Sequence, residues 1–280
     1  MLIQDKIEEM PCGSLIQHGP YNNRIYLIKL GNNFSEESLQ RLISLAKTNK
    51  YSKIFAKIPT SAANFFFNSG FLKEAEIPYF FSGKQSALFM GLYLTSDRMK
   101  ETTIDLIKKN LKIALEKTNT RKALPLNNKF FLRKCYKSDV FAMAKIYSEV
   151  FPSYPFPIND PTYLLKTMQS HIDYFGIETN GSLIAISSAE VDRKAANAEM
   201  TDFATLQKWR GNSLGQYLLA QMETKMKKKD IKTSYTIARA MSAGINITFS
   251  KAGYKYCGKL KNNTNISGKI ESMNVWYKSL

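Results

Sequence analysis

The stretch Lys208-Trp209-Arg210-Gly211-Asn212-Ser213-Leu214-Gly215 decides the fold of this chain. It follows a strand-like run, Ala198 to Thr205, and precedes an apolar stripe that predicts an amphipathic helix: Leu214, Leu218, Met222 and Met226. A small-residue loop between a strand and a helix can turn backbone N–H groups toward a phosphate, and the helix N-terminus adds the positive end of its dipole. Many such turns bind nothing, so the loop predicts a phosphate site only together with its surroundings.

The loop lacks the two best-known phosphate-binding signatures. It has neither the Gly-Lys-Ser/Thr ending of a Walker loop nor the G-x-G-x-x-G of dinucleotide-binding folds. It resembles instead the acetyl-CoA loop of the GNAT acetyltransferases, Q/R-x-x-G-x-G/A, with Lys208, Gly211 and Ser213 at the patterned positions. Lys208 and Ser213 are conservative replacements that keep a basic first residue and a small last one.

A second motif of the same family lies downstream of the loop. Asn246 and the segment Phe249 to Tyr254 are similar to N…Y-x-K-x-G-F, a short helix that closes on a Gly-aromatic turn. Phe249 stands where many family members carry a tyrosine general acid. That role is therefore empty or has moved, with Tyr254 and Tyr256 as the alternatives.

The resemblance implies a GNAT fold of the α/β (α+β) class, with a mixed, mostly antiparallel sheet splayed at its centre and flanked by helices. It also implies acetyl-CoA as co-substrate and no metal. Loop amides would bind the pyrophosphate, while a strand backbone and an asparagine side chain would hold the pantetheine arm. The cofactor-binding residues expected on this basis are Phe203, Ala204, Thr205, Lys208, Arg210, Gly211, Asn212, Ser213, Leu214, Gly215, Asn246 and Phe249.

A narrower resemblance covers nearly the whole chain. Several segments, in matching order, are similar to the beta-lysine N-acetyltransferases, which acetylate the ε-amine of beta-lysine to make a compatible solute for osmoadaptation. The resemblance implies the substrate, which composition and periodicity do not reveal. The segments are residues 15–19, 23–27, 51–59, 74–80, 198–206, 258–264 and 270–276.

Composition excludes several other classes of protein. No apolar run approaches the length of a membrane span, and Met1 to Lys6 does not begin a secretion signal, so we expect a cytoplasmic protein. The three cysteines are too few and too widely spaced for a disulfide framework or a zinc site, and two histidines leave little material for a histidine-based centre. The net charge of +17 is spread over both halves, which favours a solvated basic surface over a nucleic-acid patch.

The 280 residues suggest two units. Residues 1–125 are expected to form a degenerate GNAT-like domain without a phosphate loop, with a helix near Ser35 and a long helix over 98–122. A linker is predicted at 122–128, and residues 126–280 are expected to form the catalytic GNAT domain. The Pro152 to Pro157 segment either covers an apolar edge or walls the acceptor pocket.

Transfer of an acetyl group to an amine requires a proton acceptor, because a lysine-type ammonium has a pKa of about 10.4. Glu199 and Asp202 lie toward the end of the central strand and are the candidate catalytic residues. Their opposite parity places them on opposite faces of a regular strand, so both reach one pocket only if the strand bulges. We favour Glu199 as the base, with Asp202 as the alternative and a paired, non-catalytic carboxylate as the structural interpretation of either.

A beta-lysine acceptor also brings a carboxylate and a second amine. Arg239 is the candidate clamp for the carboxylate, because a guanidinium binds a carboxylate through two parallel hydrogen bonds. Glu271, Asn262 and Asn263 are candidates for the second ammonium.

Other functions stay open. The acceptor could be lysine or a polyamine, or the chain could be a non-catalytic GNAT shell that senses acyl-CoA or binds nucleic acid. The partner expected here is a small diamino acid, with no nucleic acid and no membrane, and a homodimer is left open.

Overall fold

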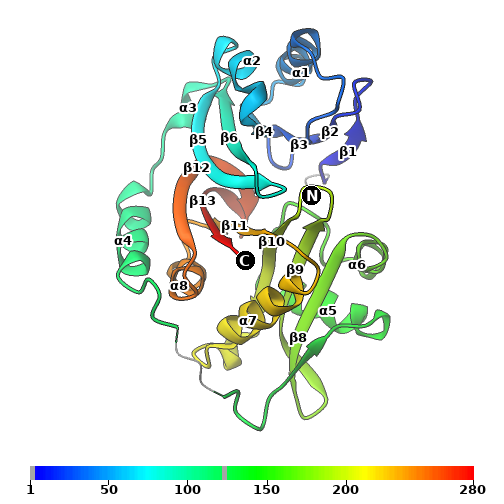
Figure 1. Ribbon diagram of the computed structural model, residues 1–280, viewed down its shortest axis with the longest axis vertical. Helices are drawn as coiled ribbons and strands as arrows, with labels where there is room; N and C mark the ends of the chain where they lie inside the picture. The colour runs from blue at the N-terminus through cyan, green and yellow to red at the C-terminus, as the bar shows by residue number, and fades with distance from the viewer. Residues whose placement is uncertain (1–3, 122–124) are drawn as a thin grey trace.

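The order of strands in a single sheet sets the architecture. A computed structural model describes residues 4–121 and 125–280, and its 13-stranded sheet runs β1-β2-β3-β4-β6-β5-β12-β13-β11-β10-β9-β8-β7 (Figure 1). In this part of the chain β3–β4 and β10–β11 pair in parallel, and the other neighbours pair antiparallel. The mixed, mostly antiparallel sheet predicted from sequence is therefore confirmed.

The amino-terminal half forms one end of the sheet. Its first long helix begins where predicted, because the Ser35 hydroxyl accepts the N–H of Ser38 and acidic residues fill the first turn. The elements of this half are β1 (Lys6–Glu9), β2 (Leu15–Gly19), β3 (Arg24–Lys29), α1 (Glu36–Thr48), β4 (Lys53–Pro59), the 3-10 helix η1 (Thr60–Ala62), α2 (Ala63–Asn68), β5 (Leu72–Phe81), β6 (Gln85–Tyr93), α3 (Ser96–Met99) and α4 (Ile104–Leu115).

The carboxy-terminal half forms the other end. No helix of the described residues is long and apolar enough to cross a membrane. The elements here are β7 (Phe131–Lys134), the 3-10 helix η2 (Lys137–Asp139), α5 (Val140–Val150), α6 (Pro161–Met168), β8 (Ile172–Thr179), β9 (Ser182–Asp192), β10 (Asn197–Thr205), the 3-10 helix η3 (Gln207–Trp209), α7 (Leu214–Lys227), β11 (Thr233–Arg239), α8 (Ala243–Lys251), β12 (Lys255–Ile266) and β13 (Lys269–Ser279).

The single helix expected over 98–122 is wrong in extent, because two tertiary contacts interrupt it. The buried Arg98 side chain donates to the Ser52 hydroxyl and the Asn22 carbonyl, which fixes α3 against the sheet. Glu101 then accepts from Lys259 and Ser272 of the β12–β13 hairpin, and α4 begins only afterwards. Residues 122–124 of the predicted linker lie outside the described residues.

The two halves share one sheet through a close approach of β5 and β12. Gly258 of β12 pairs with Ala75 of β5. A Cβ atom at Gly258 would lie 2.2 Å from the Glu74 carbonyl oxygen, so only glycine permits this approach. Aromatic and aliphatic side chains from both halves, including Phe89 and Tyr235, pack into one buried cluster beside the joint.

A bulge in β10 opens the sheet near its centre. The register between β9 and β10 shifts between Thr201 and Ala204, and Asp202 has a φ of 55°. On its other edge, β10 pairs with β11 only from Asn197 to Glu199. Beyond that point the two strands separate, which is the splay predicted from sequence.

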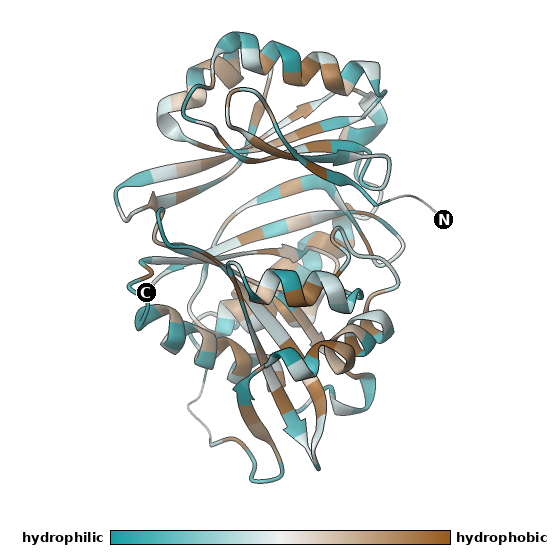
Figure 2. Cartoon of the chain, turned by 90° about the vertical axis from the view of Figure 1, so that its right-hand side faces the viewer, coloured by the Kyte–Doolittle hydropathy of each residue, from teal (hydrophilic) through white to brown (hydrophobic). Residues whose placement is uncertain are grey.

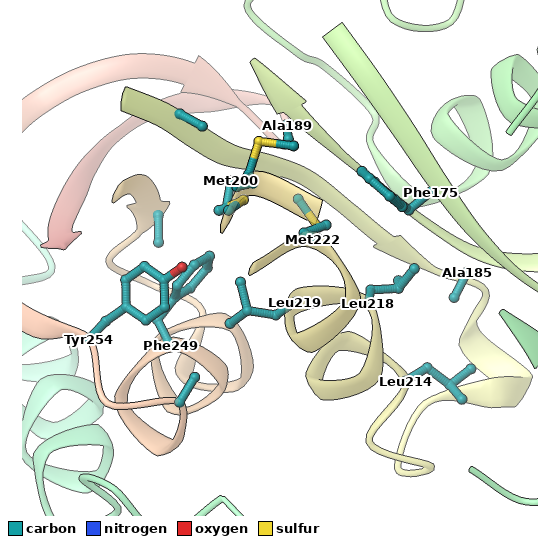
Figure 3. Packing of buried hydrophobic residues seen from close by; sticks show 14 of the residues in the cluster. Phe175, Ala185, Ala189, Met200, Leu214, Leu218, Leu219, Met222, Phe249 and Tyr254 are labelled. Carbon is teal, nitrogen blue, oxygen red and sulfur yellow. The ribbon is translucent and has the colours of Figure 1, made fainter. Parts of the chain in front are cut away.

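The core of the carboxy-terminal half confirms the predicted helix behind the loop. Leu214, Leu218, Leu219 and Met222 of α7 face Met200 and neighbouring strand residues (Figure 3). Figure 2 shows hydrophobic stretches along many of the strands and mostly hydrophilic or neutral connecting loops. Burial of the α7 stripe fixes the helix, and with it the loop that precedes the helix.

Asn246 ties α8 to two strands through a fully buried amide. Its Nδ2 donates to the carbonyls of Arg239 and Ser242, at 2.9 and 2.7 Å. Its Oδ1 accepts from Asn274 Nδ2 and from Trp276 Nε1, both at 2.9 Å. The side chain therefore uses both donors and both acceptor positions inside the protein.

We predict that Asn246→Ala destabilises the protein by about 2–4 kcal/mol, because it leaves two buried side-chain donors without a partner and removes one of the hydrogen bonds to each of two carbonyls. Denaturant unfolding measures the change. The exposed Asn159 supplies the control, since Asn159→Ala should alter stability by no more than about 0.5 kcal/mol. Equal, small changes in both variants would show that the Asn246 network does not stabilise the fold.

Candidate functional site

A cavity of about 800 Å³ lies where β10 and β11 separate. Its wall includes the loop before α7, the free ends of both strands and the Pro152–Pro157 segment. Residues of the amino-terminal half complete it, among them Arg24, Tyr26 and Phe55. The cavity therefore belongs to both halves of the chain.

The loop before α7 has the features of an anion site. Gly211 and Ser213 have φ values of 84° and 57°, and a Cβ at Gly211 would meet no atom within 4 Å. The backbone N–H groups of Gly211, Asn212 and Ser213 make no hydrogen bond to another described residue. Free donors at the start of a helix fit the oxygens of a pyrophosphate. Leu214 and Gly215 continue the cavity wall.

The other residues expected at the cofactor site divide into two groups. Phe203, Thr205 and Arg210 line the cavity, and Arg210 Nε also donates to the Thr205 carbonyl. The remaining side chains point elsewhere. Those of Ala204 and Phe249 are buried in the core, that of Asn246 is used as described above, and the Lys208 ammonium lies over the Trp209 ring.

The bulge brings Glu199 and Asp202 onto the same cavity. The alternative that required a bulged strand is therefore the one realised. Glu199 is the cross-strand partner of Glu190 on β9, and both side chains reach the cavity wall. On the other side of Glu199, the Tyr235 hydroxyl accepts from Lys57 Nζ of β4 at 3.0 Å.

Burial raises the pKa of Glu199 to about 7, and the neighbouring Glu190 charge adds to the effect. The Lys57 ammonium opposes this rise. The pKa of Glu190 shifts in the opposite direction, because the His171 imidazole, 3.6 Å away, and the Lys57 charge outweigh burial and lower this pKa. Of the pair, Glu199 is thus the carboxyl that exchanges a proton near neutral pH.

Asp202 is held more tightly than Glu199. Tyr154 of the proline-rich segment donates to Asp202 Oδ1, and Ser188 donates to Asp202 Oδ2, both at 2.5 Å. Burial raises the pKa of Asp202, while these two hydrogen bonds oppose the rise. Because both oxygens already accept hydroxyl protons, Asp202 positions Tyr154 and is the less available proton acceptor.

The residues expected to bind the acceptor are only partly on the cavity. Arg239 and Asn263 line it. The Arg239 guanidinium binds Glu271 through two hydrogen bonds of 3.0 and 2.9 Å, so each of these residues already neutralises the other. Asn262 donates to the carbonyls of Arg98 and Lys100, away from the cavity.

The tyrosines considered as general acids are not on the wall either. The Tyr254 hydroxyl is hydrogen-bonded to Ser234 in the core at 2.5 Å, and Tyr256 packs edge-on against Trp276.

The residues missed from sequence are Arg24, Tyr26 and Glu190, whereas Tyr154 belongs to the Pro152–Pro157 segment, which is one of the expected pocket walls. A signal existed for Arg24, because it is a charged residue at the start of a mostly apolar strand. Among residues 4–121 and 125–280, no cluster of three or more His, Cys, Asp or Glu could hold a metal ion.

Comparison with known proteins agrees with this geometry. The model of the Acetyltransferase (GNAT) family matches residues 142–246. The Beta-lysine N(6)-acetyltransferase of Methanococcus maripaludis is 41% identical over 95% of this chain and 96% of its own length. The Beta-lysine N(6)-acetyltransferase of Methanosarcina mazei is 32% identical over 88% of this chain and 97% of its own length. The N-acetyltransferase YodP of Bacillus subtilis is 32% identical over 95% of this chain and 96% of its own length. A crystal structure of the ribosomal-protein-S18-alanine N-acetyltransferase from Escherichia coli overlaps with 54% of this chain and 93% of that one, at 15% identity and a TM-score of 0.47.

The splayed sheet, the loop and the sequence matches define the class of protein: the chain is an N-acetyltransferase of the GNAT family, whose members use acetyl-CoA. Within that family it belongs with the beta-lysine N(6)-acetyltransferases.

We predict that Gly211→Ala raises KM for acetyl-CoA about tenfold or more, because the methyl group enters the space where backbone N–H groups would meet the pyrophosphate. Steady-state kinetics measures the effect. Gly181, in the β8–β9 turn, is a matched control: its φ is 72° and its Cβ space is equally empty. Gly181→Ala should cost similar stability and leave KM unchanged, and equal KM changes in both variants would argue against a loop-bound cofactor.

Proposed function

We propose that this N-acetyltransferase transfers the acetyl group of acetyl-CoA to the ε-amine of beta-lysine, giving N-epsilon-acetyl-beta-lysine as a cytoplasmic compatible solute. The observation that carries the proposal is the reach of the similarity: it extends over 95% of the chain and so includes both halves, which together line the cavity. A substrate pocket shared by the two halves accounts for similarity across the whole chain.

The loop before α7 and the edge of β10 would bind the cofactor. Backbone N–H groups of Gly211 to Gly215 would hold the pyrophosphate, whereas the Arg210 N–H already donates to the Gln207 carbonyl. The edge of β10 beyond Glu199 is free of β11, so the backbone of Phe203, Ala204 and Thr205 offers hydrogen bonds to the pantetheine arm, as an added strand would. When bound, acetyl-CoA supplies a thioester whose carbonyl carbon accepts the amine.

Glu199 supplies the base. At pH 7 only about one lysine-type ammonium in 2,500 is neutral, which places the reactive form about 4.6 kcal/mol above the stable one. A carboxylate whose pKa is near 7 is largely ionised at neutral or slightly alkaline pH and still basic enough to take this proton, directly or through water. Asp202 is the alternative base, but both of its oxygens already accept hydroxyl protons.

The amino-terminal half is proposed to be a degenerate copy of the GNAT unit spanning residues 1–125, followed by the catalytic unit over 126–280. Its strands run in the order β1-β2-β3-β4-β6-β5, which is the order of β8 to β13 in the other half. Both halves place their parallel pair in the middle, β3–β4 and β10–β11. Between β3 and α1, however, the chain has no counterpart of the loop at Lys208 to Gly215.

We predict that Glu199→Gln lowers kcat about 100-fold or more, with KM for acetyl-CoA nearly unchanged. In the unmodified protein, kcat/KM should rise with pH through about 7, because protonated Glu199 cannot accept the amine proton. The pH profile measures both effects. Asp202→Asn should lose less activity and keep the midpoint; loss of the midpoint in that variant, with Glu199→Gln still active, would assign the base to Asp202.

The substrate is tested by thiol release from acetyl-CoA with beta-lysine, α-lysine and spermidine offered separately. We expect a strong preference for beta-lysine. A preference for spermidine would indicate a polyamine acetyltransferase, which needs no site for a carboxylate. Tight acetyl-CoA binding without turnover of any amine would contradict the proposal.

A further inference from the structure

Two buried polar atoms without hydrogen-bond partners lie on neighbouring parts of the cavity wall. Within the described residues, Arg24 Nε and Asn263 Oδ1 have no partner. Arg24 is 3% exposed and Asn263 1%, yet both line the cavity. The two residues touch, since Arg24 Nη1 donates to the Asn263 carbonyl oxygen at 2.5 Å. A cationic donor and a neutral acceptor are thus held side by side and remain unused.

The charge of Arg24 is only partly compensated, by the more distant carboxylates of Asp5 and Glu74. In contrast to Arg239, which binds Glu271, Arg24 has no carboxylate within ion-pair distance among the described residues. The nearby buried Arg98 adds a second cation, donating through Nη2 to the same Asn263 carbonyl. Burial lowers the pKa of Arg24 to about 10, which leaves it charged at neutral pH. A buried cation of this kind is costly unless an anion pairs with it.

The guanidinium is fixed in place before any ligand arrives. It lies 5.4 Å from the centroid of the Tyr26 ring and 5.7 Å from that of Phe55. Its Nη1 also donates to the Thr264 hydroxyl at 3.1 Å. A rigid, desolvated donor of this kind loses little freedom on binding, which favours a strong and selective contact.

The cavity wall carries charges of both signs, with Arg24 as a cation and Glu190 and Glu199 as a carboxylate pair. Arg24 and Tyr26 are two residues apart on β3, so their side chains share a face about 7 Å apart along the strand. Tyr26 lies in the fields of Arg24 and of Glu190 and Glu199. The buried Lys57 ammonium acts on Tyr26 more strongly than these groups, so Tyr26 is near charges of both signs.

We propose that Arg24 and Asn263 bind the head group of the acceptor: Arg24 pairs with its carboxylate, and Asn263 Oδ1 accepts from its β-ammonium. This inference rests on the proposed function, and it assigns substrate selection to a residue of the amino-terminal half. In beta-lysine the carboxylate and the β-amine are separated by one methylene, which suits two contacts on touching residues. The aliphatic stem then passes Tyr26, and the ε-amine reaches Glu199.

Three acceptors distinguish the contact of Arg24 with the carboxylate from that of Asn263 with the β-ammonium. Beta-lysine carries both groups, 6-aminohexanoate lacks only the β-amine, and 1,4-diaminopentane lacks only the carboxylate. We expect Arg24→Gln to lower kcat/KM about 100-fold for beta-lysine and 6-aminohexanoate, which carry a carboxylate. For 1,4-diaminopentane, kcat/KM should change by no more than about threefold. Retained turnover of 1,4-diaminopentane also shows that the variant is folded and binds acetyl-CoA. Should Arg24→Gln not fold, Arg24→Lys keeps the charge and is expected to lose about tenfold on the carboxylates alone.

A second variant should reverse the preference for acceptors that carry a carboxylate. Asn263→Asp is nearly isosteric and gives Arg24 a built-in counterion, so it should bind 1,4-diaminopentane better and both carboxylates worse. An unchanged KM for 1,4-diaminopentane in this variant would overturn the role of Asn263. Arg239→Gln tests the other candidate for the carboxylate contact. It should change kcat/KM for the three acceptors alike, through loss of the contact with Glu271.

Equal losses on all three acceptors in Arg24→Gln, or a carboxylate-selective loss in Arg239→Gln, would overturn the assignment of Arg24. If the unmodified protein acetylates none of the acceptors, the proposed function fails. The carboxylate site is then tested separately, by calorimetric measurement of 6-aminohexanoate binding to the unmodified protein and to Arg24→Gln. Binding that Arg24→Gln abolishes would support the carboxylate site. Absent binding, or equal binding in both proteins, would overturn it.

Discussion

The bulge at Asp202 is the constraint on which the rest of the site depends. An αL conformation at a non-glycine residue is unfavourable, and here hydrogen bonds from Ser188 and Tyr154 to the Asp202 carboxylate hold it in place. Because of the bulge, Glu199 and Asp202 share one cavity, and Phe203 lies close to Gly215 at the start of α7. A regular strand would close the gap beside β11 and separate the base from the cofactor edge.

Much of the fold could be predicted because local patterns agree with the tertiary structure. The stripe from Leu214 to Met226 is buried as a unit, and Ser35 caps the helix that follows it. The helix over 98–122 could not be delimited, because contacts of Arg98 and Glu101 with distant strands end one helix and delay the next. Such contacts leave no periodic signal in the sequence.

The parts of the site that depend on backbone geometry could be predicted from the sequence. The parts that depend on which side chains pair could be predicted less well. The loop at Lys208 to Gly215 was recognisable from residue size and order, and the bulge was foreseen as one alternative for Glu199 and Asp202. Residue type alone makes Arg239 the candidate clamp for the substrate carboxylate, but in the structure Arg239 binds Glu271. Which arginine keeps its charge unpaired depends on contacts between distant segments, and the sequence does not display them.

The close approach at Gly258 has an evolutionary consequence. It joins the second half of the sheet to a first half that has no counterpart of the loop before α7. Residues of β3 and β4 that face the cavity can change without altering the grip on the acyl donor. Duplication followed by the loss of one cofactor site would thus give a lineage a surface on which acceptor preference can drift while the chemistry stays constant.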